Sequence, residues 1–333
     1  MIQVRPAIAV IGGGVIGLTS AIRLREAGFA VTLLAHALPP HTTSDIAAAF
    51  WSPSATADNP KTKQWAITSL AAFRSLAADP ASGVALLDLY SLAALPTAMP
   101  YMANAGAMRE VPPGVFPAPW SGWCATVPRI DVPVYMPWLL ARLQALGGQV
   151  QLQIIESLQA IDPAYALIVN CTGLGAQALT GDTMFPVRGQ VISVRKPAGL
   201  APAIIYANDD ATTTYIIPRS RDCLLGGTYQ YRDGNLDVDL TIAEQILARC
   251  AVFNPAFQQP EIFQHRVGLR PGRHFVRLEQ ERLPSGQKVI HNYGHGSIGH
   301  TLSWGCAVEV VKLASNHSPP PNLPHTGLTF THK

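Results

Sequence analysis

A glycine-rich turn near the N-terminus constrains the fold more than any other feature of the sequence. A short apolar run leads into Gly-Gly-Gly-Val-Ile-Gly, with motif glycines at Gly12, Gly14 and Gly17. A helix is expected over Leu18–Ala27 and a second strand over Phe29–Leu34. The first glycine permits the tight turn, the second lets backbone amides approach a pyrophosphate, and the third lets helix and strand pack closely. The pattern predicts a βαβ unit that binds a dinucleotide.

This unit lacks one side chain that such sites usually have. An acidic residue commonly follows the second strand and binds ribose hydroxyls. Here the segment reads Leu-Ala-His-Ala-Leu-Pro-Pro over residues 34–40, without an acid and without an arginine that would indicate NADP. Either His36 or backbone groups replace the acid, or the adenosine end is held less tightly.

The segment Thr42–Trp51 begins with hydroxyl side chains and continues into alanines. This composition suits a helix start that packs against a phosphate or a ring. Asp45 is interpreted as a first-turn charge that favours the helix dipole.

A second glycine-rich run, Val289–Ala307, follows an apolar strand-like stretch and precedes a helix expected from about Thr301 to Leu313. Its glycines are Gly294, Gly296, Gly299 and Gly305. Glycine weakens strand and helix interiors, so these positions indicate a backbone that comes very near something flat or charged.

Other segments predict helices, strands and loops. The expected helices cover residues 61–78, 137–146 and 241–249. A buried strand that ends in Thr-Gly is expected over 166–173 and an antiparallel hairpin over 215–218 and 223–229. Residues 53–133 are rich in proline and show no sustained period-two pattern. A helix is expected there over 61–78 and an irregular loop over 112–119, in a second domain or at its edge.

Taken together, these features resemble D-amino acid oxidases, in the family's order and over nearly the whole chain. The matching segments are Val10–Gly17, Thr42–Trp51, Val169–Gly173, Arg188–Gln190, Tyr215–Tyr229, Arg266–Pro271, Arg277–Glu279 and Val289–Ala307. The resemblance implies non-covalent FAD, a neutral D-amino acid and molecular oxygen. Hydride transfer from the α-carbon to the flavin would yield an imino acid, which hydrolyses to a 2-oxo acid and ammonia, and reoxidation would yield hydrogen peroxide.

The resemblance also implies an α/β protein (α+β overall) with discontinuous domains. A Rossmann-like FAD-binding domain is expected from about residues 1–52, 134–186 and 264–333. A mainly antiparallel β substrate domain is expected from about 53–133 and 187–263. A length of 333 residues agrees with a prior of about two domains.

Site residues follow from the same resemblance. The expected FAD contacts are Gly12, Gly14, Val15, Ile16, Gly17, Thr42, Thr43, Ser44, Ala48, Ala49, Phe50, Ile155, Thr172, Gly173, Gly294, Gly296, Ser297, Ile298, Gly299, His300 and Thr301. The Thr301 hydroxyl and nearby helix amides are expected to satisfy the N1–C2=O edge of the reduced flavin.

Arg270 is the expected clamp for the substrate carboxylate, because a guanidinium binds a carboxylate bidentately. Arg273 is the fallback. Tyr215, Tyr229 and Ser297 are the other expected substrate contacts, although tyrosines in hairpins are commonly half-buried core residues. No catalytic acid or base is expected, because a neutral substrate amine needs none.

Three other functions stay open. D-aspartate oxidase would need a second cation, for which Arg219 and Arg221 are candidates. A glycine or sarcosine-type amine oxidase shares the Gly-Leu-Arg-Pro element. A flavin-binding protein without turnover is the third. The small, polar loop 207–214 suggests a pocket that opens readily, with fast product release.

Composition and charge exclude several functions. The net charge of +3 and the dispersed basic residues predict no nucleic-acid or lipid surface. No apolar run approaches about 18 residues, so no membrane span is expected. With neither a signal-peptide layout nor a terminal Ser-Lys-Leu, we expect a cytoplasmic protein, with a homodimer left open.

Neither disulfides nor a metal site is expected. The five cysteines form no Cys-x-x-Cys pair and are expected to be buried thiols. His291, His295 and His300 lie in a glycine-broken run that cannot present two ligands on one helix face.

Overall fold

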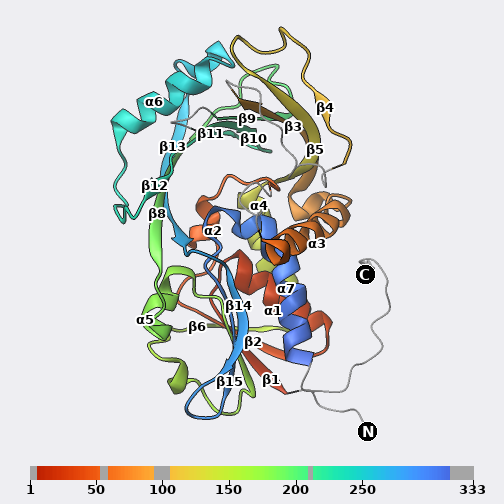
Figure 1. Ribbon diagram of the computed structural model, residues 1–333, viewed down its shortest axis with the longest axis vertical. Coiled ribbons are helices and arrows are strands. Elements are labelled where there is room, and N and C mark those ends of the chain that lie inside the picture. The colour runs from red at the N-terminus through yellow and green to blue at the C-terminus, as the bar shows by residue number, and fades with distance from the viewer. Residues whose placement is uncertain (1–5, 53–58, 94–105, 209–212, 316–333) are drawn as a thin grey trace.

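The computed structural model describes residues 6–52, 59–93, 106–208 and 213–315, which fold around two β-sheets. In Figure 1 the six-stranded sheet occupies the lower half of the molecule and the nine-stranded sheet the upper half. The mixed α/β class expected from the sequence is confirmed.

The six-stranded sheet has the order β14-β15-β7-β1-β2-β6. Its strands are β1 (Ala7–Ile11), β2 (Ala30–Ala35), β6 (Gln149–Leu152), β7 (Leu167–Asn170), β14 (Arg277–Arg282) and β15 (Lys288–Tyr293). All pairings are parallel except β14 with β15. β1 is apolar and almost fully buried because helices cover such a parallel sheet.

Four long helices pack against one another next to the sheets, with α1 beside both α4 and α7 and with α3 on α7 (Figure 1). The helices are α1 (Val15–Glu26), α2 (Thr43–Ile46), α3 (Pro60–Leu76), α4 (Val132–Ala145), α5 (Ala176–Thr180), α6 (Leu240–Ala251) and α7 (Gly299–Ser315). The expected helices are therefore present. α1 begins three residues, and α4 five residues, before the predicted start.

The nine-stranded sheet is antiparallel apart from the parallel pair β3–β9. Its strands are β3 (Val84–Ala93), β4 (Arg109–Glu110), β5 (Ser121–Ile130), β8 (Phe185–Val194), β9 (Ala203–Asn208), β10 (Thr213–Pro218), β11 (Cys223–Gly226), β12 (Gln230–Tyr231) and β13 (Ile262–Gly272). The predicted hairpin is confirmed as β10–β11, although β11 ends at Gly226.

Residues 53–133 contain two long strands that no period-two pattern indicated. β3 and β5 pair antiparallel over ten residues each, from Val84 opposite Ile130 to Ala93 opposite Ser121. Burial along β3 does not alternate, because neighbouring strands and helices cover parts of both faces. A strand of this kind has no period-two signal in its sequence.

The long strand β13 connects the two halves of the molecule. It pairs with β8 from Ile262 to Gly272 and then leads into β14 of the other sheet. Residues 264–272, expected in the FAD-binding domain, thus pair with the nine-stranded sheet. The end of β13 also contacts the short 3₁₀ helices η5 (Gly173–Gly175) and η7 (Gly296–Ile298).

One large apolar core includes residues from both sheets and from α1, α3, α4 and α7. A second core lies under α6. All five cysteines are free and buried, as expected. In the described ranges, no helix has the length and apolarity needed to cross a membrane.

Candidate active site

A cavity of about 960 Å³ lies between the ends of the parallel strands and the nine-stranded sheet. Its walls include the segments that follow β1, β2, β6 and β7, together with parts of β10 and β13 and the start of α7. Ligands of α/β proteins bind beyond the carboxyl ends of the strands. The volume is near the upper end of the range of about 300–1,000 Å³ that is usual for ligand pockets.

The N-terminal glycine turn forms one wall. Gly12 has φ +115°, and a Cβ there would lie 2.5 Å from the carbonyl oxygen of Cys171. Gly14 precedes α1, where the Val15 amide donates to Ser44 Oγ at 3.0 Å. Both glycines line the cavity, so the start of α1 faces the cavity, and a helix N-terminus favours an anion.

The expected contact between Gly17 and FAD is wrong, because Gly17 does not line the cavity. A Cβ at Gly17 would overlap the carbonyl oxygen of Gly12. This glycine allows the helix to pack on the turn, which stabilises the fold without a contact to the ligand.

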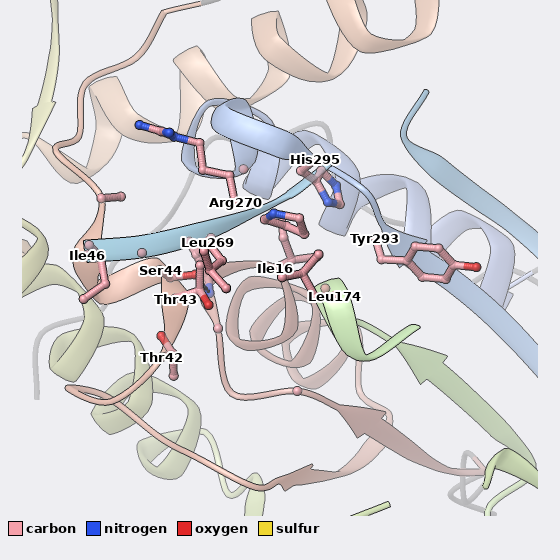
Figure 2. A pocket seen from close by; sticks show the side chains of 18 of the residues that line it. Ile16, Thr42, Thr43, Ser44, Ile46, Leu174, Leu269, Arg270, Tyr293 and His295 are labelled. Carbon is pink, nitrogen blue, oxygen red and sulfur yellow. Dashed lines mark hydrogen bonds between the residues drawn. The ribbon is translucent and has the colours of Figure 1, made fainter. Parts of the chain in front are cut away.

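The segment Thr42–Phe50 forms the adjoining wall. The Thr42 amide and hydroxyl both donate to Asp45 Oδ2, at 2.9 and 2.6 Å. Asp45 is buried, so its carboxylate caps α2 from inside the protein in addition to lying in the first turn. This cap orients Thr42, Thr43 and Ser44 along the cavity, as Figure 2 illustrates.

Only part of the C-terminal glycine-rich run faces the cavity. Gly296 and Gly299 line it, whereas Gly294 and Gly305 do not. Gly294 has φ +83°, and a Cβ there would lie 2.8 Å from the Arg273 side chain. A Cβ at Gly305 would collide with the backbone of α3. Gly294 and Gly305 therefore allow segments of the chain to pack closely against each other. This corrects the interpretation that all four glycines approach a ligand.

The expected role of the Thr301 hydroxyl also needs correction. α7 begins at Gly299, two residues earlier than predicted. The Thr301 hydroxyl accepts from the Ser52 amide at 3.2 Å and donates to the Ser52 carbonyl at 3.1 Å. Thr301 lines the cavity, but its hydroxyl already has protein partners. Any contact to an electron-rich ring edge falls to the first amides of α7.

Three buried polar atoms on the cavity wall have no hydrogen-bond partner within the described residues. They are Asn292 Oδ1, His295 Nε2 and His300 Nδ1. Leaving such an atom unpaired costs about 1–3 kcal/mol. A bound ligand with matching polar groups would satisfy these atoms, and FAD carries such groups on its flavin ring and ribityl chain.

The two histidines are neutral hydrogen-bonding groups in this environment. Burial lowers the pKa of His295 to about 3. Burial also lowers the pKa of His300, whose Nε2 lies 3.1 Å from the Ser44 carbonyl oxygen. Because a carbonyl only accepts, Nε2 must carry the proton. His300 Nδ1 is then an acceptor, which suits a ligand hydroxyl or N–H group and not a phosphate oxygen.

Arg270, near the end of β13, has contacts that leave part of its guanidinium free for a ligand. Nη1 donates to the carbonyls of Arg188 and Thr228 at 3.2 and 3.1 Å. A Cβ at Gly189 would lie 2.6 Å from Cζ of Arg270, so only glycine leaves room for the guanidinium. Figure 2 shows the side chain pointing away from Thr42, Thr43 and Ser44.

Two tyrosines flank this guanidinium. Cζ of Arg270 lies 5.4 Å from the ring centroid of Tyr229, which is 58% exposed. Tyr215 is buried, and its ring lies against Gly226 and Gly227, where a Cβ would overlap it. Burial raises the pKa of Tyr215 more than the positive charge of Arg270 lowers it, so the phenol stays protonated. With Ser297, all four expected substrate contacts line one cavity.

The other candidate arginines are absent from the lining that the structure describes. Arg219 is buried in an ion pair with Asp222, and Arg273 pairs with Asp182 at 2.9 Å. Arg221 is exposed outside the cavity. Among the described lining residues, Arg270 is the sole arginine or lysine, and none of the carboxylates described pairs with it.

Sequence reasoning missed several residues of the cavity wall. The missed residues with polar or aromatic side chains include His41, Gln153, Glu156, Tyr206, Thr213, Thr228, Asn292, Tyr293 and His295. His36, suggested in place of the missing acid, does line the cavity. Asn292, Tyr293 and His295 lie in the glycine-rich run 289–307 and Thr228 lies in the matching segment 215–229, but no pattern assigned these side chains to the site. Strand pairing between distant segments brings Gln153, Glu156 and Tyr206 there.

Comparisons with known proteins agree with this geometry. The family model for FAD dependent oxidoreductase matches residues 7–313. A D-amino-acid oxidase of Rubrobacter xylanophilus is 41% identical over 313 residues, which cover 92% of this chain and 94% of that protein. A D-aspartate oxidase of Homo sapiens is 36% identical over 325 residues, covering 92% and 94%.

A solved structure of glycine oxidase from Bacillus cereus has a TM-score of 0.78 and 20% identity, covering 94% of this chain and 95% of that one. This likeness concerns the fold alone. The matches extend across both sheets and the cavity between them. The protein is therefore an FAD-dependent enzyme, and the chain belongs to the FAD dependent oxidoreductase family.

Proposed function

We propose that this enzyme oxidises neutral D-amino acids to 2-oxo acids, with release of ammonia and hydrogen peroxide. The observation that carries the proposal is Arg270. Its guanidinium lies on the cavity wall between Gly189 and Tyr229, without a carboxylate partner among the described residues. An unpaired guanidinium beside a protonated phenol suits the carboxylate of an amino acid.

The protein residues would bind and orient the substrate. Arg270 would hold the substrate carboxylate bidentately, and the Tyr215 hydroxyl would donate to it. Ser297 lines the same cavity and would accept from the substrate amine. With these ends held, the α-hydrogen can be directed at the cofactor, and orientation of this kind accounts for much of catalysis. FAD, when bound, accepts the hydride and returns the electrons to oxygen.

The charge of the cavity favours neutral side chains over D-aspartate. A second substrate carboxylate would need a second cation, and burying an unpaired carboxylate is costly. The described lining offers a single guanidinium and no lysine. The internal segments 53–58, 94–105 and 209–212, which lie outside the description, contain neither lysine nor arginine in the sequence. The expectation about the loop 207–214 falls partly on these residues, so it stays a prediction.

Anaerobic reduction of the purified yellow protein tests the proposal. D-alanine or D-valine should bleach the oxidised flavin spectrum, and admission of oxygen should restore it with formation of hydrogen peroxide. L-alanine is the matched control and should leave the spectrum unchanged. Bleaching by D-aspartate or by glycine in preference to D-alanine would replace the proposed substrate class. A spectrum that no amino acid changes would indicate a flavin-binding protein without turnover.

A further inference from the structure

The chain segment that follows β6 borders the cavity beside the end of β2. β2 and β6 are parallel neighbours with Ala35 opposite Leu152, and the Gln153 amide donates to the Ala35 carbonyl at 2.9 Å. The carboxyl ends of the two strands therefore lie at one edge of the sheet. Residues 34–37 and 153–156 all line the cavity there.

Glu156 supplies the carboxylate that is missing after β2. Among the described residues that line the cavity, it is the sole Asp or Glu. Its side chain is exposed and has no hydrogen bond or ion pair with the described protein. Asp45 and Asp182 do not line the cavity, and Thr42 and Arg273 respectively occupy their carboxylates.

We propose that Glu156 binds the adenosine ribose of FAD in place of the acid that usually follows the second strand. Ribose hydroxyls are donors, and a carboxylate accepts from both of them in charge-assisted hydrogen bonds. His36 lines the same part of the cavity, but a neutral imidazole offers one acceptor nitrogen. The proposal depends on FAD as the cofactor and not on the identity of the oxidised substrate.

An apolar surface adjoins this carboxylate. Ile154 lines the cavity and is 74% exposed, and Ile155 lies beside it and is partly buried. An adenine ring placed against Ile154 and Ile155 would remove this apolar surface from water. The ribose attached to that ring would then lie near Glu156, which immediately follows in the chain.

Titration of apoprotein with FAD and with FMN tests the role of Glu156. Quenching of flavin fluorescence measures each Kd, so no turnover is needed. Glu156→Gln should raise the Kd for FAD about tenfold and leave the Kd for FMN unchanged, because FMN lacks the adenosine. Glu244→Gln, on the exposed face of α6, is the matched control and should change neither value.

An FAD analogue that lacks the adenosine 2′- and 3′-hydroxyls completes a double-mutant cycle. Loss of the hydroxyls should weaken binding to the wild-type protein and have almost no further effect on Glu156→Gln. Full, independent losses in both proteins would overturn the proposal, as would unchanged FAD affinity in Glu156→Gln. Failure of D-alanine to reduce the flavin would contradict the proposed function and leave this titration valid.

Discussion

The two regions that meet at the cavity present different parts of the chain to it. The proposed nucleotide region presents largely backbone, since Gly12, Gly14 and the start of α1 line the cavity. The proposed substrate region presents the side chains of Arg270 and Tyr215, carried by the nine-stranded sheet. Both regions contain glycines. In the substrate region these glycines make room for the side chains of Arg270 and Tyr215 and not for the ligand.

This difference predicts that the two regions can be damaged separately. A side-chain change in the substrate region should affect turnover and leave flavin affinity intact. A change in the glycine turn should affect flavin binding or the fold before it affects substrate preference.

The largest effect is expected for Arg270→Ala. Loss of the guanidinium leaves the substrate carboxylate unpaired, so kcat/KM for D-alanine should fall by about 100- to 10,000-fold. Steady-state kinetics measure this loss, and titration with FAD should give a wild-type Kd. Arg221→Ala, an exposed arginine outside the cavity, is the control. Loss of flavin affinity in Arg270→Ala would show that the two regions are not separable.

Gly189→Ala sharpens the comparison because it alters no group proposed to touch the substrate. The new Cβ would lie 2.6 Å from Cζ of Arg270, and the flexible guanidinium must move. Displacement of a binding group by about 1 Å can lower the rate about 100-fold, so kcat/KM should fall by about 10- to 100-fold. The free energy of unfolding should stay unchanged. Gly234→Ala, with its nearest atom at 3.8 Å, should retain full activity. Equal activity in both variants would mean that Gly189 does not position Arg270.

Gly17→Ala and Gly14→Ala separate packing from ligand contact within one turn. The Cβ of Gly17→Ala overlaps the Gly12 carbonyl, so the apoprotein should lose about 3 kcal/mol in the free energy of unfolding. The Cβ of Gly14→Ala would meet only the Ser44 side chain, with Oγ at 3.0 Å, so the main effect should be about a tenfold higher Kd for FAD. Urea unfolding of apoprotein and flavin titration distinguish the two. An unfolding curve for Gly17→Ala that matches wild type would contradict the packing role.

The smallest effect is expected where the two regions are tied together. Asp182 accepts from Arg273, just after β13, and from the Tyr293 hydroxyl at the end of β15, at 2.9 and 2.8 Å. Burial alone would raise the pKa of Asp182, but these two partners lower it below its usual value. The contribution to stability is therefore present above the unfolded pKa and is lost as the pH falls through the folded pKa.

Asp182→Asn should accordingly lower the free energy of unfolding by about 1 kcal/mol at pH 7. The difference from wild type should shrink as the pH falls below about 4, since the wild-type carboxyl then becomes protonated. Urea titrations at pH 7 and pH 3 measure both values. A stability difference between wild type and Asp182→Asn that grows as the pH falls would contradict the downward shift assigned to the pKa of Asp182.

The nucleotide region could be predicted largely from local sequence, and the substrate region only in part. The strand, glycine turn and helix at residues 7–26 depend on contacts between near neighbours, and their order is visible in the chain. The resemblance brought Arg270 and Tyr215 forward, but no local pattern identified Gly189 or Gly226 as the glycines beside them. β3 and β5 were missed because neighbouring elements, and not their own periodicity, determine which residues are buried.

The sequence by itself determined the dinucleotide turn and the second glycine-rich run, because glycine requirements are set by backbone geometry. Only the tertiary structure decided what each glycine approaches. Gly12 and Gly296 line the cavity, whereas Gly17, Gly294 and Gly305 pack against protein. The position of Glu156 was likewise decided by the tertiary structure. Glu156 lies near the end of β2 because β2 pairs with β6, a segment more than a hundred residues away in the chain. Such pairings follow from the packing of the whole chain, and a local pattern contains no information about them.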